Sequence, residues 1–375
     1  MIRKSVATTG LLLCVALTIP TYAKKRAAPK AAVPAIPQIT LEQKIDHALN
    51  RLTFGPRPGD AERVRQVGLQ AFIDEQLHPE IIAEDPVLEA KLAPLETLRM
   101  SASEMVEKYP PQQQIRAMAK GNLPYPTDPE TLQIVQRVID RYKARLAQGK
   151  PDPDNVTEDR PPADLARAAE SLTPMQRQVF QFGAPAEKVA LFERLPTARQ
   201  YEILDAMPRA KRQGLFSIAS PALRRKIQLF QGGPQQVVNT DLAEGKILRA
   251  VYSNRQLEEV LTDFWYNHFN IFLDKGADKY MVTTYERDVI RPHVLGSFKD
   301  LLLATAQSPA MLFYLDNAQS AAPGMDAKNP NAKKPVRGLN ENYARELMEL
   351  HTLGVDGGYT QLDVTEVARC FTGWT

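Results

Sequence analysis

Cysteine is nearly absent from the sequence, which has two in 375 residues, Cys14 and Cys370. We expect Cys14 to be removed with a leader peptide, which would leave Cys370 alone. No intramolecular disulfide could then form, and the protein would depend on its hydrophobic core. The motifs G-x-S-x-G, H-E-x-x-H and S-x-x-K with its companions are also missing. Their absence removes the usual sequence signs of serine and zinc hydrolases.

Long hydrophobic runs are missing too. The apolar stretch at about residues 10–19 is too short to span a bilayer. It follows Arg3 and Lys4 and leads to small residues ending at Ala23, which is the pattern of a secretory signal peptide. We therefore predict a signal peptide at residues 1–23, a secreted or periplasmic protein, and no stable membrane span after cleavage. A short membrane anchor is the competing interpretation.

Neither sign of charge dominates, since 47 Lys and Arg face 44 Asp and Glu. Removal of Arg3 and Lys4 would leave 45 basic and 44 acidic residues, a balance of +1. The basic cluster Lys24-Lys25-Arg26 lies in an Ala/Pro/Lys-rich stretch, residues 24–39, which we interpret as a linker. Nucleic-acid binding needs a concentrated basic surface. We therefore predict no nucleic-acid partner.

No stretch alternates with the period of two that strands show, whereas helical spacing recurs along the chain. This predicts an all-α fold, a multi-helix bundle-like globular domain with an inserted array of short helices. Pro196, Pro208 and Pro221 punctuate the array. The predicted parts are an N-terminal helical part at 40–99, the Pro-punctuated insertion at 100–235, and a C-terminal helical part, expected to be incomplete, at 236–375.

Three positions carry clear helix-start signals. Ser297 and Thr360 each stand three residues before an aspartate, and Ser308 precedes a proline. In the helix that follows Thr360, Val364 and Ala368 belong to one apolar stripe.

The segment "RQLEEVLTDFWYNHFNIF", residues 255–272, is the first that could carry chemistry. Helical spacing places a set of apolar side chains on one face with His268 in its middle. That set is Leu257, Val260, Leu261, Phe264, Ile271 and Phe272. A buried histidine needs a hydrogen-bond partner or a metal. It is most often a neutral core residue bonded to a backbone carbonyl.

A second segment, "ENYARELMELHTL", places a carboxylate on a buried face. With Asn340 as cap and Gly354 as stop, the predicted helix buries Tyr343, Leu347, Leu350 and Leu353. Glu346 falls within that arc and His351 at its edge. A buried glutamate is costly unless it is paired or protonated.

His268 and Glu346 could therefore explain each other. One hypothesis is a carboxylate–imidazole pair acting as general base, or holding a divalent metal together with His351. The other is a structural hydrogen bond between two helices. Glu346 and His351 are five positions apart, which is not the i, i+3 or i, i+4 spacing of paired ligands on one helix.

Four segments resemble one known family. They are "LNRLTFGPRPGDAERVRQVGLQAFIDEQLHPE", "LTDFWYNHFNIF", "YERDVIRPHVLGSFKDLLLATAQSPAMLFYLDN" and "GLNENYARELMELHTLGVDGGYTQLDVTEVARCFTGWT". Together they are similar to a bacterial family known as domain of unknown function 1800. The resemblance implies an exported helical protein that acts with another exported protein encoded nearby. It also implies a chain continuing beyond Trp374, so that this sequence would be a C-terminally truncated member.

The family resemblance assigns no role to His268, Asp316, Glu346 or His351, although its segments contain all four. Two functional classes therefore stay open. One is a cell-envelope metal-dependent hydrolase that uses His268 and Glu346 as catalytic residues, with His351 as a further metal ligand. The alternative is a non-catalytic binding or assembly protein that works with an exported partner. The sequence decides neither the substrate nor whether the protein is an enzyme.

Overall fold

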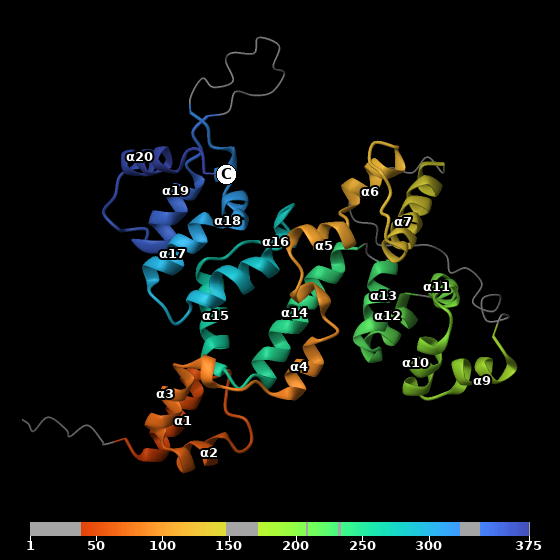
Figure 1. Cartoon of the computed structure of the whole chain (residues 1–375), viewed down its shortest axis with the longest axis horizontal. Coiled ribbons are helices and arrows are strands. Elements are labelled where there is room, and N and C mark those ends of the chain that lie inside the picture. The colour runs from red at the N-terminus through yellow and green to blue at the C-terminus, as the bar shows by residue number, and fades with distance from the viewer. Residues whose placement is uncertain (1–38, 148–171, 208, 232–233, 323–337, 375) are drawn as a thin grey trace, which may run out of the picture. The chain divides into compact units, whose positions relative to one another are not determined.

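The computed structural model describes residues 39–147, 172–207, 209–231, 234–322 and 338–374. Every regular element in these ranges is a helix and none is a strand (Figure 1). The all-α prediction is confirmed. The predicted signal peptide, residues 1–23, and residues 24–38 of the predicted linker lie outside the described residues. Close contacts divide the chain into residues 1–40 and residues 41–375, and the elements below belong to the second unit.

The first helices form small local cores. They are α1 (Leu41–Leu52), α2 (Asp60–Val67), α3 (Leu69–Gln76), η1 (Pro79–Ile81), α4 (Pro86–Leu92), η2 (Glu96–Leu98), α5 (Ala102–Lys108), α6 (Gln112–Ala119) and α7 (Pro129–Ala147). Ile45 and Leu49, one turn apart on α1, pack with Val64 and Phe72. This spacing is that of an amphipathic helix, and its apolar face closes the α1–α3 unit.

An array of short helices follows. It comprises α9 (Pro174–Phe182), α10 (Pro185–Arg194), α11 (Thr197–Ala206), α12 (Arg209–Ile218) and α13 (Pro221–Gln231). Proline is the first residue of α9, α10 and α13, and Pro196 directly precedes α11. Proline suits the first helical position because the N–H that it lacks would be unpaired there. The predicted array of short helices punctuated by Pro196 and Pro221 is confirmed here, while Pro208 lies outside the described residues.

The remaining helices contain the candidate site. They are α14 (Gln235–Tyr252), α15 (Gln256–His268), α16 (Asp278–Thr284), η3 (Tyr285–Ile290), η4 (Arg291–His293), α17 (Phe298–Gln307), α18 (Pro309–Tyr314), η5 (Asn317–Gln319), α19 (Asn342–Glu346), η7 (Leu347–Thr352) and α20 (Gln361–Phe371). The predicted starts are confirmed. Ser297 caps α17, Thr360 forms a capping box with Asp363, and α18 begins at Pro309.

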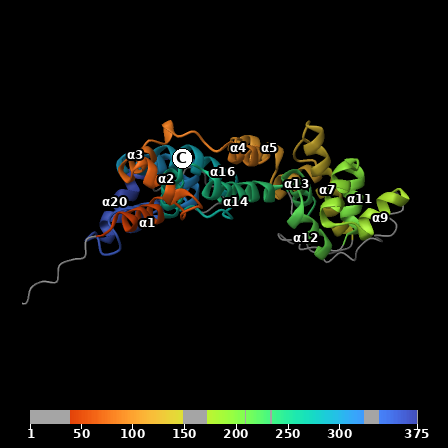
Figure 2. The same ribbon diagram turned by 90° about the horizontal axis from the view of Figure 1, so that it is seen from below.

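Helix α14 lies at the centre of the local packing. It contacts α4, α13, α15 and α16, and both views show α4 running beside it (Figures 1 and 2). A second core, with Phe269, Tyr285, Met311 and Tyr343 among its members, joins α15 to the later helices. Among the described residues, no helix is both long and apolar enough to cross a bilayer.

The predicted continuous α-helix over residues 341–353 is wrong in its second half. After α19 the chain forms a π-helix, η7, in which the N–H of Leu353 bonds to the carbonyl of Met348, 2.9 Å away. A π-turn holds more residues than an α-turn, so it rotates the positions that follow. Leu350 and Leu353, predicted to be buried, are mostly exposed, whereas His351, predicted at the edge, is buried.

The apolar face predicted for residues 255–272 is also partly wrong. Helix α15 ends at His268, so Phe272 lies beyond it, and both Phe264 and Phe272 are mostly exposed. The buried face instead carries Glu259 and Thr262. A buried glutamate is tolerated where a cation and hydrogen bonds compensate it, and Glu259 has such a partner.

Candidate functional site

The structure brings the two predicted histidines together. His268, the last residue of α15, is half-buried, and its Nε2 donates a hydrogen bond to the backbone carbonyl of His351 at 3.1 Å. Their ring centroids are 6.3 Å apart. Burial lowers the pKa of His351 to about 4, and the nearby His268 contributes a smaller part of this shift. His351 is therefore neutral at physiological pH.

Glu346 is not part of this contact. It is the last residue of α19 and is half-buried, and in the described part of the chain its carboxylate makes no hydrogen bond or ion pair with either histidine. Burial and then the charge of Glu349 raise its pKa, against the opposing effect of Arg345. The described residues include no group of three or more His, Cys, Asp or Glu placed to hold a metal ion. The roles assigned to His268, Glu346 and His351 stay predictions.

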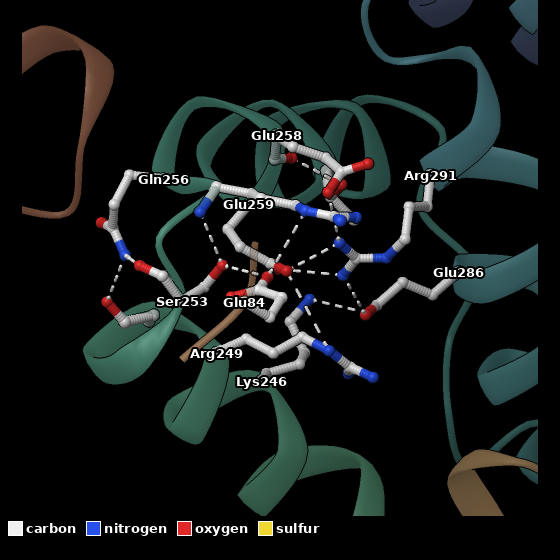
Figure 3. Close-up of polar contacts among 12 residues, drawn as sticks. Glu84, Lys246, Arg249, Ser253, Gln256, Glu258, Glu259, Glu286 and Arg291 are labelled. Atoms are coloured by element: carbon white, nitrogen blue, oxygen red, sulfur yellow. Dashed lines mark hydrogen bonds and ion pairs between the residues drawn. The ribbon is translucent and has the colours of Figure 1, made fainter. Parts of the chain in front are cut away.

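A larger polar cluster lies between α14, α15 and η3–η4 (Figure 3). Its centre is a two-pronged ion pair in which Arg291 reaches the two carboxylate oxygens of Glu259 at 2.7 and 2.8 Å. Glu286 and Glu258 lie 3.8 and 3.7 Å from the same guanidinium. Paired N–H groups fix the orientation of a carboxylate as well as its charge. Glu259 is thus held rigidly on the buried side of α15.

Burial favours the neutral forms of the charged side chains in this cluster, whereas the ion pairs favour the charged forms. Burial alone would lower the pKa of Arg291, but its hydrogen bonds to Glu259 and the neighbouring carboxylates raise it overall. The pKa of Glu258 is raised by burial despite Arg291. That of Arg249 is lowered by burial and by Arg291. The direction of the pKa shift is therefore set by charge pairing at Arg291, and by desolvation at Glu258 and Arg249.

Lys246 connects α14 to the same cluster. Its Nζ lies 3.1 Å from Glu286 and 3.2 Å from Asp263, and 4.4 Å from the ring centroid of Tyr266. One ammonium is therefore shared by two carboxylates and an aromatic face. Both its charge pairs and its cation–π contact limit the movement of this long side chain.

The other end of the cluster ties in distant segments. Glu84, which precedes α4, accepts hydrogen bonds from the hydroxyl of Ser253 at 2.7 Å and the N–H of Asn254 at 3.1 Å. Gln256 accepts from the N–H of Phe54 at 3.2 Å. These bonds hold the segment after α1 and the segment before α4 against the junction of α14 and α15.

An open hollow of about 190 Å³ lies on this cluster. Its wall consists of Phe54, Lys246, Ile247, Ala250, Glu259, Thr262, Asp263 and Glu286. Phe54 and Ile247 are 49% and 65% exposed. Apolar side chains thus stand beside charges that are fixed by ion pairs, which is a combination suited to binding.

Comparison with protein-family models gives one family, described as "Protein of unknown function (DUF1800)", whose model matches residues 47–375. The chain belongs to the DUF1800 family. No curated protein and no solved structure matches it. The DUF1800 match covers every residue of the polar cluster and of the hollow.

Sequence reasoning missed this part of the DUF1800 fold. Glu259 reads as one of two acids in the first turn of α15, where acidic residues are common for electrostatic reasons alone. Glu286 and Arg291 lie in a segment that carried the family resemblance, but nothing in their spacing links them to Glu259. The available signal was the number of charges in the segments that resemble the family, Asp263, Glu286 and Arg291 included.

Proposed function

We propose that this DUF1800 protein is an exported, non-catalytic binding protein that assembles with a second exported protein. The observation that carries the proposal is the hollow, where Phe54 and Ile247 stand exposed beside a fixed set of charges. Exposed apolar side chains with polar ones beside them are typical of protein interaction sites. The leader-like N-terminus supports export to a compartment that such a partner would share.

The charges favour binding over catalysis because they already have partners. Arg291 occupies both carboxylate oxygens of Glu259, and Lys246 is shared by Asp263 and Glu286. A general base needs a free acceptor within reach of its substrate. Paired charges instead form a rigid surface, and rigidity reduces the entropy lost when a partner binds.

A metal-dependent hydrolase has less support. It would use His268 and Glu346 across an open pocket, whereas the hydrogen bond of His268 goes to the backbone of His351. This is how a histidine with a structural role is usually satisfied. The hydrolase hypothesis therefore remains a prediction from the sequence, without a contact that favours it.

The test uses, as candidate partner, an exported protein encoded near this one, which the family resemblance implies, produced together with this chain. Light scattering after size exclusion would measure the mass of the complex. We expect a complex with the wild type and at least a tenfold weaker one, a loss of about 1.4 kcal/mol, with Ile247→Asp, because a charge placed on the apolar wall must be desolvated on docking.

Ile81→Asp is the matched control, since Ile81 is 71% exposed on η1 and does not line the hollow. This variant should assemble as the wild type does. Absence of any complex would overturn the binding proposal. If both substitutions weakened the complex equally, the hollow would not be the binding site.

A further inference from the structure

The wall of the hollow carries more negative than positive charge. Glu259, Asp263 and Glu286 line it together with Lys246. Two arginines outside the wall lie near Glu259, Arg291 at 2.7 Å and Arg249 at 4.0 Å, while the single ammonium of Lys246 serves both Asp263 and Glu286. Asp263 thus shares its cation with a second carboxylate, whereas Glu259 has two cations near it.

The surplus charge is accessible to a partner at Asp263. Its side chain is 43% exposed, whereas those of Glu259 and Glu286 are almost completely buried. A partner that covered Phe54 and Ile247 would also remove water from Asp263. Burial of a carboxylate that shares its ammonium with a second carboxylate is costly, so an apolar partner without a cation would be disfavoured.

The size of the hollow suits a long side chain. Its volume of about 190 Å³ is many times the roughly 10–15 Å³ that is needed on the same measure to hold one water molecule. Arginine and lysine can lay their methylene stems along apolar surface while the charged head stays among polar groups. Phe54 and Ile247 offer such a surface, and the exposed Asp263 offers such a polar end.

We propose that the hollow receives one arginine or lysine side chain of the protein partner, flanked in that partner by apolar residues. The inference rests on the proposed binding function and names the chemistry of its partner. The cation restores the charge balance at Asp263, and the flanking residues cover Phe54 and Ile247. A partner with an acidic or neutral side chain at this position should bind more weakly, because it brings no cation to the carboxylate of Asp263.

The test uses the full chain with methyl-labelled isoleucine, observed by NMR, and two peptides. One is acetyl-Leu-Arg-Leu-amide, and the other has citrulline, a neutral isostere, in place of arginine. We expect the arginine peptide to shift the methyl resonance of Ile247 and to bind about tenfold more tightly than the citrulline peptide, as expected for one well-placed charge pair.

Asp263→Asn should remove the difference between the peptides, because it removes the surplus charge. Glu366→Gln is the matched control. Glu366 is 52% exposed on α20, pairs with Arg369 as Asp263 pairs with Lys246, and does not line the hollow. In this variant the difference should persist.

Two results would overturn the inference. Equal binding of both peptides at Ile247 would show that the hollow binds without regard to charge, and the proposed binding function would stand. An arginine peptide that leaves the Ile247 resonance unmoved would also refute it. The proposed function is judged separately, by the complex with the exported partner, so the two failures are distinguishable.

Discussion

Buried charged residues in this protein fall into two groups that differ in their partners. Glu259 is compensated by the two-pronged ion pair with Arg291. Asp278, the first residue of α16, is completely buried, and neither of its carboxylate oxygens has a hydrogen-bond partner among the residues that the structure describes. The nearby Lys275 instead bonds to Asp316 at 3.0 Å. The protonation state of Asp278 should therefore affect stability.

We predict that Asp278 contributes a fall in stability as the pH rises from about 4 to about 7. Burial raises the pKa of Asp278 from 3.8 to about 7, with Lys275 opposing and Asp316 reinforcing the shift. In this range the unfolded chain has released a proton that the folded chain retains. Raising the pH therefore favours unfolding until the folded carboxyl is also ionised.

Asp278→Asn should be more stable than the wild type at pH 8, by up to about 4 kcal/mol, because a tenfold change in proton affinity corresponds to about 1.4 kcal/mol. The gain should shrink towards pH 4. Urea unfolding at both pH values measures it. Asp46→Asn, at an exposed position on α1, controls for the loss of one negative charge. A gain of the same size at both pH values would contradict the assignment.

At the scale of elements, the start of each helix was easier to predict than its buried face. The caps at Ser297 and Thr360 involve residues three positions apart, so the sequence shows both partners at once. The faces of α15 and of the η7 region depend on segments elsewhere in the chain. Phe264 is exposed and His351 is buried for that reason, against the helical spacing.

We predict that the capping box of α20 contributes about 1 kcal/mol to stability, as N-caps typically do. The hydroxyl of Thr360 accepts from the N–H of Asp363, and the N–H of Thr360 donates to the carboxylate of Asp363 at 2.7 Å. Thr360→Ala removes the first bond, so it should lower the free energy of unfolding and speed amide exchange at the start of α20. Thr360→Ser keeps the hydroxyl and should behave as the wild type. Equal losses in both variants would assign the effect to the methyl group.

At the scale of the whole molecule, the array α9–α13 has a hydrophobic core of its own. Phe192, Ile203, Leu204 and Ile227 pack within it, and among the described residues the buried members of this cluster come from residues 172–227. A separate core allows a segment to unfold separately. That residues 100–235 form an insertion into the family domain stays a prediction, although the compact core of the array is what an inserted unit would need.

We therefore predict that Phe192→Ala loosens the array alone. Phe192 is completely buried, and its truncation should cost about 3 to 5 kcal/mol locally. Amide hydrogen exchange followed by mass spectrometry should then rise across α9–α13 and stay unchanged in α16. Phe182→Ala, at a mostly exposed position on α9, is the control and should change neither. Faster exchange in α16 as well would show that the two regions unfold together.

The all-helical class, the short helices separated by prolines and the caps follow from the sequence, because each depends on residues within a few positions of one another. His268 and His351 were also candidate site residues in the sequence. Which charges are paired depends instead on how the folded chain packs. Glu259 and Arg291 are 32 positions apart, and Glu84 meets Ser253 across 169. No periodicity links such positions, since burial of a charge is decided by the partner that packing brings to it.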